Sequence, residues 1–250
     1  MDRRGSIWRC PFLSGQERHA LQYGKTLGEN SDAPLVGMLN FLGFNEQTFP
    51  ASVLGIGGSP RKGGNSDLLL AAILGGAASV IPVTGTVHLR DYQFQSCTGC
   101  ERCRVDRTCT GLHDGMTLLY PSLLASPGLV LVSPTHHYNI TALMKAFIDR
   151  CYCFYDFGDT RPRPWSSRLA GQGRKAVIAA IAEQADREDM GVTLEAMRLP
   201  LTALGYEIID EIAVFGLFDR GIIRDHPDLL ETAREAGRKL GRSLLSGEQG

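Results

Sequence analysis

The sequence predicts an α/β protein in which helices cover both faces of a doubly wound, five-stranded parallel sheet, giving three layers. Three observations support this fold class. Five short apolar runs recur along the chain, segments with helical periodicity separate them, and glycines stand at the ends of several runs. Strands that alternate with helices pair in parallel and are joined by right-handed crossovers, which bring helices onto both faces.

Each strand is expected at one of the apolar runs. The run "GLVLVSP" at 128–134 is almost wholly apolar, as is typical of a strand that is buried on both faces. His88 makes the second run less apolar than the others. The five strands are predicted at 51–59, 85–91, 128–134, 174–182 and 206–216.

Helices are expected between these strands. Asp114 and Asn139 are candidate N-caps, because their short side chains can accept a bond from a first-turn amide. Pro121 interrupts or shortens the helical segment that follows Asp114, and Pro227 suits a first turn. The helices are predicted at 66–80, 116–125, 139–154, 190–205 and 226–245.

The 250 residues fit one large domain with an appendage. We predict that residues 1–50 form an N-terminal extension of unknown role. Residues 51–250 are predicted to form the folded domain, with a cysteine-rich insert at 95–111. The Pro- and Gly-rich connection 155–173 is long for a compact domain, and such loops often carry function or form interfaces.

Composition narrows the class of partner. A net charge of −1 gives no general attraction to nucleic acid or to a membrane surface, so we expect neither as a partner. No apolar run is long enough to span a bilayer, and the first fifteen residues lack the apolar segment of a secretory signal. We therefore expect a cytoplasmic protein whose thiols stay reduced.

The first motif is "GIGGSPRKGGNSD" at 55–67, a Gly- and Ser-rich turn between a strand and a helix. A helix N-terminus points backbone N–H groups at one place and favours an anion there. Arg61 and Lys62 add positive charge. Pro60 stands where a dinucleotide fingerprint needs glycine, and no Lys-Ser or Lys-Thr follows Gly63 as a Walker loop requires.

A monophosphate such as that of FMN therefore suits this turn. The alternative is an ordinary polar turn with Asn65 or Ser66 as the N-cap. The second motif, "SPTHHYNI" at 133–140, follows the strand 128–134 and lies where open α/β sheets bind ligands. A flat heteroaromatic ring could lie along its backbone. Asp149 and Arg150, further along the same segment, are expected to form a structural ion pair or an interface contact and not to be catalytic.

The third motif holds four cysteines in the segment 95–109. The spacing C-x2-C-x2-C-x5-C lets one loop wrap a [4Fe–4S] core, and its first three ligands repeat the spacing of bacterial ferredoxins. Zinc is a rival, although structural zinc sites usually use two separated ligand pairs. Bare redox thiols and a structural loop are further alternatives. The candidate ligands are Cys97, Cys100, Cys103 and Cys109.

The segments "GSPRKGGNSDLLL", "CTGCERCRVDRTC" and "SPTHHYNITALMKAFIDR", in this order and spacing, resemble the flavodoxin-like NADPH-dependent FMN reductase superfamily, and within it the iron–sulfur flavoproteins. The resemblance covers roughly residues 51–245 and implies a flavodoxin-like fold. It also implies that the first segment holds the FMN phosphate and that the third follows the isoalloxazine ring. The cysteine spacing matches the compact motif of the iron–sulfur flavoproteins.

The resemblance assigns residues of this chain to FMN. The phosphate would be held by Ser59, Arg61, Gly64, Asn65 and Ser66, with Lys62 beside them. The ring would lie along Pro134, Thr135 and His136, with His137, Tyr138, Asn139 and Ile140 behind. Two departures stand out. His136 replaces the usual tyrosine, and "AAIAEQADRED" at 179–189 places Glu183 and Gln184 where relatives often have a glycine-rich turn.

The resulting prediction is an FMN-dependent redox flavoprotein in which electrons pass between a [4Fe–4S] cluster and FMN. Reduced ferredoxin or NAD(P)H would be the donor and a small molecule the acceptor, and relatives assemble as homodimers or homotetramers. One alternative is a cluster-free NAD(P)H-dependent FMN or quinone reductase. Another is a zinc-stabilised interaction module on the same scaffold. No residue stands out as a general acid or base.

Overall fold

The central sheet has five parallel strands in the order β2-β1-β3-β6-β7. The computed structural model describes residues 52–81 and 83–246, so the predicted extension 1–50 lies outside the described residues. This order is that of flavodoxin-like sheets, in which β2 is added on one side of β1 and the later strands are added on the other side, beginning with β3. The strands are β1 (Ser52–Gly57), β2 (Val83–His88), β3 (Gly128–Pro134), β6 (Lys175–Ile181) and β7 (Glu207–Val214).

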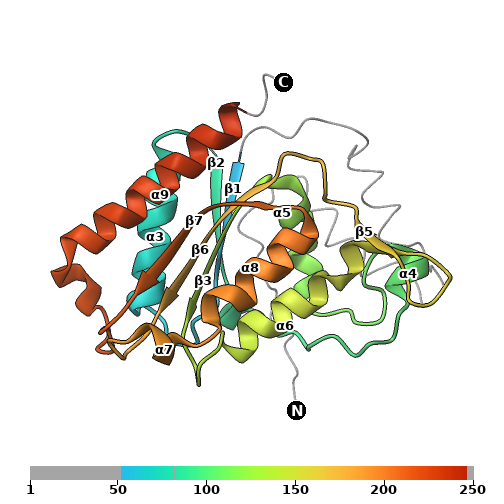
Figure 1. The fold of residues 1–250 in the computed structure, drawn as a ribbon, viewed down its shortest axis with the longest axis horizontal. Helices are drawn as coiled ribbons and strands as arrows, with labels where there is room; N and C mark the ends of the chain where they lie inside the picture. Colours follow the sequence, from blue (N-terminus) through green and yellow to red (C-terminus); the bar gives the residue numbers. More distant parts are fainter. Residues whose placement is uncertain (1–51, 82, 247–250) are drawn as a thin grey trace, which may run out of the picture.

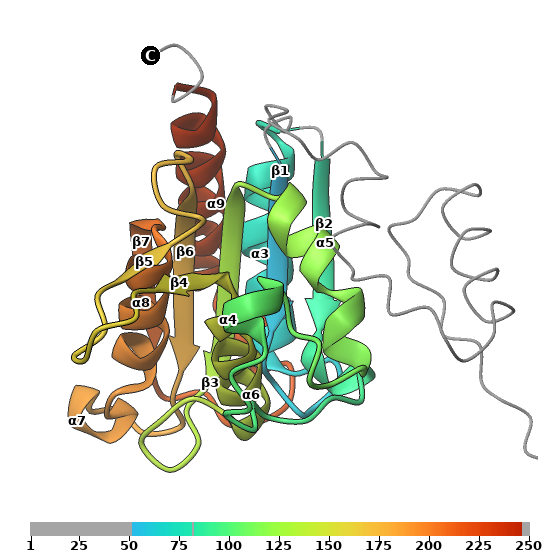
Figure 2. The ribbon, with the colours of Figure 1, turned by 90° about the vertical axis from the view of Figure 1, so that its right-hand side faces the viewer.

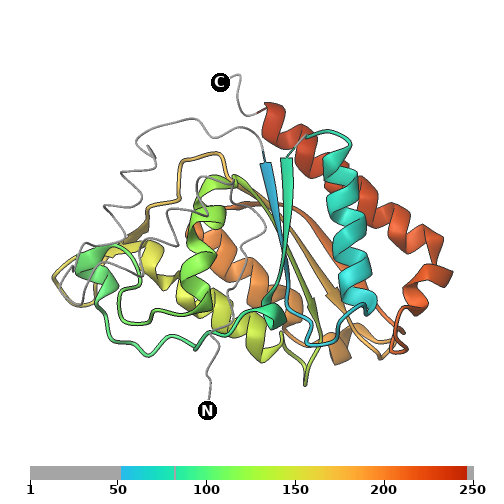
Figure 3. The same cartoon turned by 180° about the vertical axis from the view of Figure 1, so that it is seen from behind.

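Helices cover both faces of this sheet, which confirms the three-layer prediction (Figures 1 and 3). One face carries α3 (Asn65–Ala78) and α9 (Pro227–Ser246). The other carries α5 (Tyr120–Ala125), α6 (Ala142–Arg150) and α8 (Thr193–Leu204). Shorter helical elements connect these: η1 (Leu89–Asp91), α4 (Cys103–Asp106), η2 (Gly115–Leu118), η3 (Cys151–Phe154), α7 (Arg187–Met190) and η4 (Ile222–Asp225).

Each face of the sheet buries its own hydrophobic core. Ile73, Val130 and Leu240 belong to the core between the sheet and the α3/α9 pair. Leu131 and Phe147 belong to the core on the other face. Neighbouring residues of β3 thus enter opposite cores, because side chains alternate across a strand. Burial on both faces explains why this run is apolar in the sequence.

The helix predicted at 139–154 is shorter than expected. Thr141, and not Asn139, is its N-cap, because the Thr141 hydroxyl accepts a hydrogen bond from the amide of Met144 (3.2 Å) and donates one to the carbonyl of Gly58 (2.7 Å). The Asn139 side chain instead accepts a bond from the amide of Ile140 (2.8 Å). The last turn, after Arg150, is the 3₁₀ helix η3.

Two other predicted segments also differ in detail. Asp114 is an N-cap as expected, accepting a bond from the amide of Met116 (3.1 Å), but it begins the 3₁₀ turn η2. The α-helix α5 starts only at Tyr120, with Pro121 in its first turn, where the missing N–H removes no helical bond. The strand predicted at 85–91 ends at His88, and η1 follows it.

The long connection 155–173 contains a small antiparallel hairpin of β4 (Tyr155–Phe157) and β5 (Trp165–Ser167). Figure 2 shows this hairpin and α4 in front of the central strands, on the face that α6 and α8 cover. The hairpin therefore lies beside the cysteine-rich segment. Among the helices of the described residues, none combines the length and apolar character needed to cross a membrane.

Candidate functional site

A cavity of about 120 Å³ lies at the carboxyl edge of the sheet, beyond the ends of β1 and β3. Four loops contribute to it, and they follow β1, β3, β6 and β7. Eight of the residues predicted for FMN line this cavity: Ser59, Arg61, Gly64, Asn65, Ser66, Pro134, Thr135 and His136. The remaining lining residues are Ile181, Glu183, Leu217, Phe218 and Arg220. The first and second sequence motifs thus come together at one place.

The other five predicted residues lie outside this lining. Lys62 is exposed on the loop, and Ile140 is buried in the core below. His137 and Tyr138 occupy the tip of a turn closed by a bridge between His136 and Asn139, and both tip residues have a positive φ (52° and 66°). Tyr138 is 56% exposed.

Local hydrogen bonds shape the loop after β1. The Ser59 hydroxyl accepts a bond from the amide of Arg61 (3.2 Å), and the Asp67 carboxylate accepts one from the amide of Gly63 (2.7 Å). Gly63 has φ +67°, a conformation that side-chain-bearing residues rarely adopt. These bonds fold the loop back over the first turn of α3.

Arg90, which follows β2, stabilises this loop through hydrogen bonds to the loop and to Asp67. Its guanidinium donates two bonds to the carboxylate of Asp67 (2.9 and 2.8 Å) and two more to the backbone carbonyls of Ser59 and Arg61 (3.1 and 3.2 Å). Sequence reasoning missed Arg90. The only available signal was a basic residue just after an apolar run, and such residues are common.

The N-terminus of α3 faces the cavity with its backbone donors. Gly64 is the N-cap and provides no side-chain cap, and first-turn N–H groups have no partner within a helix. The side chain of Asn65 is used elsewhere: it donates to the carbonyl of Asp219 (3.0 Å) and accepts from the amide of Ile223 (3.3 Å). Uncapped amides beside Arg61 suit an anion such as a phosphomonoester.

The loop after β3 is anchored to its neighbours. The amide of Thr135 donates to the carbonyl of Ile181 (2.7 Å), and the hydroxyls of Thr135 and Thr193 share a hydrogen bond (3.1 Å). Thr141 ties the same loop to the loop after β1 through its bond to Gly58. These bonds hold a length of backbone along the cavity, where a flat ring could lie. The cavity lining therefore fits both the phosphate and the ring of FMN.

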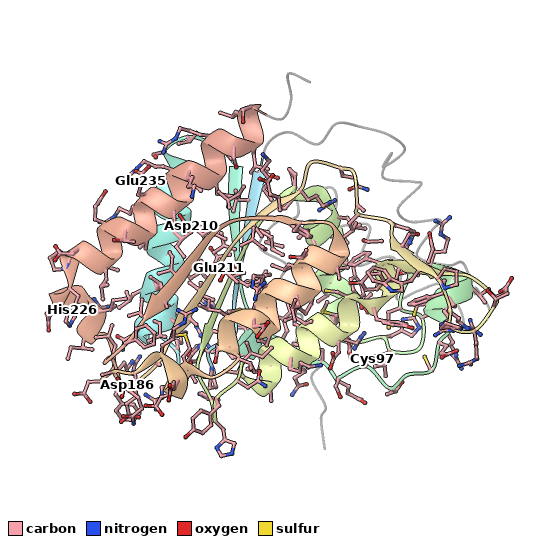
Figure 4. The ribbon with its side chains drawn as sticks, viewed as in Figure 1. Cys97, Asp186, Asp210, Glu211, His226 and Glu235 are labelled. Carbon is pink, nitrogen blue, oxygen red and sulfur yellow. The ribbon has the colours of Figure 1, made fainter. Side chains whose placement is uncertain are left out.

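The four cysteines of the third motif line a second cavity, of about 310 Å³, together with Asp149, Arg150 and Tyr152. Figure 4 shows Cys97 toward the α4 end of the molecule, while Asp186, next to α7, lies toward the opposite end. All four thiols are free. Burial, followed by the charges of Cys109, Cys97 and Cys100, raises the pKa of the Cys103 thiol. The Cys103 thiol is thus close enough to the other three to be affected by their charges.

Within residues 52–81 and 83–246, no three His, Cys, Asp or Glu side chains are grouped tightly enough to hold a single metal ion. Four sulfurs around one zinc would each lie about 2.3 Å from it, so they would be nearly in contact. Thiols that surround a wider space suit a core of several atoms better. The donor set and the cavity therefore fit a cluster.

A buried arginine holds the ends of the cysteine segment. Arg150 is 1% exposed and donates to both carboxylate oxygens of Asp114 (2.8 and 3.2 Å) and to the carbonyl of Gln95 (2.9 Å). Burial alone would raise the pKa of Asp114, but the bonds from Arg150 and from the amides of Gln95 and Met116 hold it below its usual value. Asp149 pairs instead with Lys145. Asp149 and Arg150 therefore form ion pairs with other residues and not with each other.

The cysteine loop needs unusual backbone angles. Gly99, Glu101 and Arg107 all have a positive φ, between 55° and 66°. A Cβ on Gly111 would lie 2.5 Å from the sulfur of Cys100, so this glycine leaves room for the thiol. The side chain of Arg104 donates to the hydroxyl of Tyr152 (3.0 Å) and lies over the ring of Phe157 (4.6 Å), which packs the hairpin onto the loop.

Residues 51–216 match the family model of the NADPH-dependent FMN reductases. The chain belongs to this family. The match covers all five strands of the sheet and every residue that lines the cysteine cavity. It also includes the loops after β1 and β3, whereas Leu217, Phe218 and Arg220 follow its end.

Among curated relatives, an iron–sulfur flavoprotein of Archaeoglobus fulgidus is 37% identical over 97 residues, which are 39% of this chain and 44% of the relative. An iron–sulfur flavoprotein of Methanosarcina thermophila is 33% identical over 98 residues, 39% of this chain and 51% of the relative. The matched part of this chain thus spans about half the length of these proteins.

Solved structures show the same fold. An FMN-dependent NADH-azoreductase from Bacillus anthracis, solved in complex with FMN, superposes with a TM-score of 0.57 at 14% identity. The superposition covers 76% of this chain and 99% of the azoreductase. At this identity the likeness concerns the fold alone, and it confirms the predicted flavodoxin-like architecture of this FMN reductase family member.

Proposed function

We propose that the protein is an FMN-dependent redox flavoprotein of the iron–sulfur type, with FMN in the first cavity and a [4Fe–4S] cluster among the four cysteines. One observation carries the flavin assignment. A single cavity joins the uncapped N-terminus of α3, the cation of Arg61 and the anchored backbone from Pro134 to His136. A phosphomonoester linked to a flat ring needs these three features together.

In this proposal the protein binds and orients the cofactor. FMN supplies hydride and single-electron chemistry when bound. Arg61, the hydroxyl of Ser59 and the first-turn amides of α3 would hold the phosphate. The ring would lie along Pro134, Thr135 and His136, and the bond between Thr135 and Thr193 would keep this backbone in place.

The cysteine cavity would hold the cluster through Cys97, Cys100, Cys103 and Cys109. A [4Fe–4S] cluster supplies single-electron transfer when bound. Buried Arg150 lines the same cavity and would place a positive charge beside the anionic thiolates. Charge and hydrogen bonding near the sulfurs set the potential of such clusters. Arg104, bonded to Tyr152 and packed on Phe157, would contribute a second positive charge near this loop.

The remaining assignments complete the proposal. NAD(P)H or reduced ferredoxin would be the donor, and a small molecule would be the acceptor. The protein would act in the cytoplasm as a homodimer or homotetramer. The exposed indole of Trp165 and the hairpin around it are a candidate contact surface between subunits.

A cluster-free NAD(P)H-dependent FMN or quinone reductase is the second candidate. It needs only the first cavity, and the four cysteines would remain the free thiols that the structure shows. A zinc-stabilised interaction module is less well supported. Among the described residues no three donor side chains are grouped tightly enough for a single ion, and such a module would not need the loop after β1 to bind an anion.

An ultraviolet–visible spectrum of protein purified without oxygen separates these candidates. Iron and acid-labile sulfide assays and identification of the extracted flavin accompany it. FMN with about four irons per chain is expected. FMN without iron, even after reconstitution, leaves the simple reductase. Bound zinc with no flavin uptake would refute the redox assignment.

A further inference from the structure

The segment 217–223, which follows β7, forms a wall of the first cavity that none of the three sequence motifs includes. Leu217, Phe218 and Arg220 of this segment line the cavity beside Ser59 and Arg61. More than 150 residues separate it in sequence from the loop after β1, so the contact depends entirely on the fold.

Two sets of contacts bind this segment to the loop after β1 and to the start of α3. The side-chain amide of Asn65 donates to the carbonyl of Asp219 (3.0 Å), and its oxygen accepts from the amide of Ile223 (3.3 Å). The guanidinium of Arg61 lies over the ring of Phe218 (4.7 Å) and donates to the Phe218 carbonyl (3.5 Å). Asn65 is 8% exposed, so both of its bonds are shielded from competing water.

The side chain of Arg220 lies against Gly63 of the loop after β1. A Cβ built on Gly63 would lie 3.1 Å from the Nη2 atom of Arg220, which places the guanidinium directly against the loop. Arg90 is already bound to Asp67, whereas Arg220 makes no hydrogen bond or ion pair with another described residue. Its charge is therefore available to a ligand. Glu183 also lines the cavity, but the two arginines outnumber it.

We propose that Arg220 is a second cationic ligand of the phosphomonoester, acting together with Arg61, and that Asn65 is the residue that positions it. The cavity would then select FMN over riboflavin by gripping the phosphate from two segments that are distant in sequence. An arginine can donate two hydrogen bonds to a phosphate, so it adds direction as well as charge. This inference rests on the proposed function.

The test compares binding of FMN and of riboflavin to the flavin-free full-length protein, by quenching of flavin fluorescence. Arg220→Gln should raise the Kd for FMN about tenfold, the loss expected for one charge-assisted hydrogen bond. It should leave the Kd for riboflavin unchanged. Arg220→Lys should keep part of the FMN affinity, because it retains the charge but not the paired donors.

Arg224→Gln is the matched control. Arg224 is an exposed cation immediately after this segment, donates to the carbonyl of Gly221, and does not line the cavity. Its removal changes the net charge equally and should leave both Kd values at the wild-type level. Asn65→Ala should lower the preference for FMN as Arg220→Gln does. Combining the two changes should cause little further loss, because Asn65 acts through Arg220.

Three outcomes would overturn the inference. Arg220→Gln protein that binds FMN as tightly as the wild type would remove Arg220 from the site. Equal weakening of FMN and riboflavin would show that the segment only supports the fold. Equal effects of Arg220→Gln and Arg224→Gln on FMN binding would show that the effect comes from the change in net charge and not from a contact between Arg220 and the phosphate. Wild-type protein that binds no flavin would refute the proposed function as well.

Discussion

Two adjacent glycines in α3 should respond to the same substitution with opposite signs. Gly76 is buried where α3 crosses α9, and a Cβ built on it would lie 1.9 Å from the backbone carbonyl oxygen of Arg234. Gly75 is exposed, and a Cβ there would meet no atom within 4 Å. Gly76→Ala should destabilise the protein, and Gly75→Ala should stabilise it.

The size of each effect can be worked from these contacts. Real Cβ atoms essentially never approach closer than 3.0 Å, so α9 must recede by about 1.1 Å at Gly76, the difference from 1.9 Å. A gap of that size forfeits about half of each van der Waals contact across the helix pair. Overpacking costs about 3 kcal/mol here, at the upper end of its range, and the helix propensity of alanine offsets about 1 kcal/mol.

The expected net loss for Gly76→Ala is therefore about 2 kcal/mol, and the expected gain for Gly75→Ala is about 1 kcal/mol. Urea unfolding followed by circular dichroism measures both free energies of unfolding. Gly237→Ala should resemble Gly76→Ala, because its Cβ would lie 1.9 Å from the carbonyl oxygen of Ile73. The combination should cost less than the sum, since both changes separate the same helices. Equal stabilities of Gly75→Ala and Gly76→Ala proteins would refute this reasoning.

Three further predictions concern the cysteine segment. Arg150→Met should lower the free energy of unfolding by about 3–5 kcal/mol, because it leaves the carboxylate of Asp114 without its partner. Adding Asp114→Asn should recover part of that loss. A double variant that is no more stable than Arg150→Met in urea unfolding would contradict this account. The folded-state pKa of Asp114 lies below its usual 3.8, so the ion pair contributes fully above that value and is lost as pH falls through the folded pKa. The difference in unfolding free energy between the wild-type and Asp114→Asn proteins should accordingly stay constant around neutral pH and decrease below about pH 4. A difference that already decreases above pH 6 would show that a titratable group other than Asp114 is responsible. Gly111→Ala should displace the thiol of Cys100 and lower the iron content per chain. Cys153→Ala, which removes a buried thiol outside the cavity lining, should keep the iron content of the wild type. Equal iron content in the two variants would show that Gly111 does not make room for a cluster ligand.

Local pattern was sufficient for the strands and for the loop after β1. The run 128–134 was predicted with the bounds that β3 has, because burial on both faces demands an unbroken apolar run. Ser59, Arg61 and Asn65 lie in one short segment, so a strand followed by a helix brings them together without further information. The four cysteines also lie within one short segment of the sequence, and in the structure they line one cavity.

The sequence alone therefore determined the order of the elements, the parallel sheet and the two clusters of candidate site residues, since each depends on residues that are neighbours in the chain. Only the tertiary structure placed Arg90 and Arg220 against the loop after β1, and Arg150 across the ends of the cysteine segment. It also made Thr141 the N-cap of α6 through a bond to Gly58. Each of these contacts joins residues that are far apart in the sequence. The contacts depend on how the helices and loops pack against the sheet, and a local pattern of apolar and polar residues does not predict that packing.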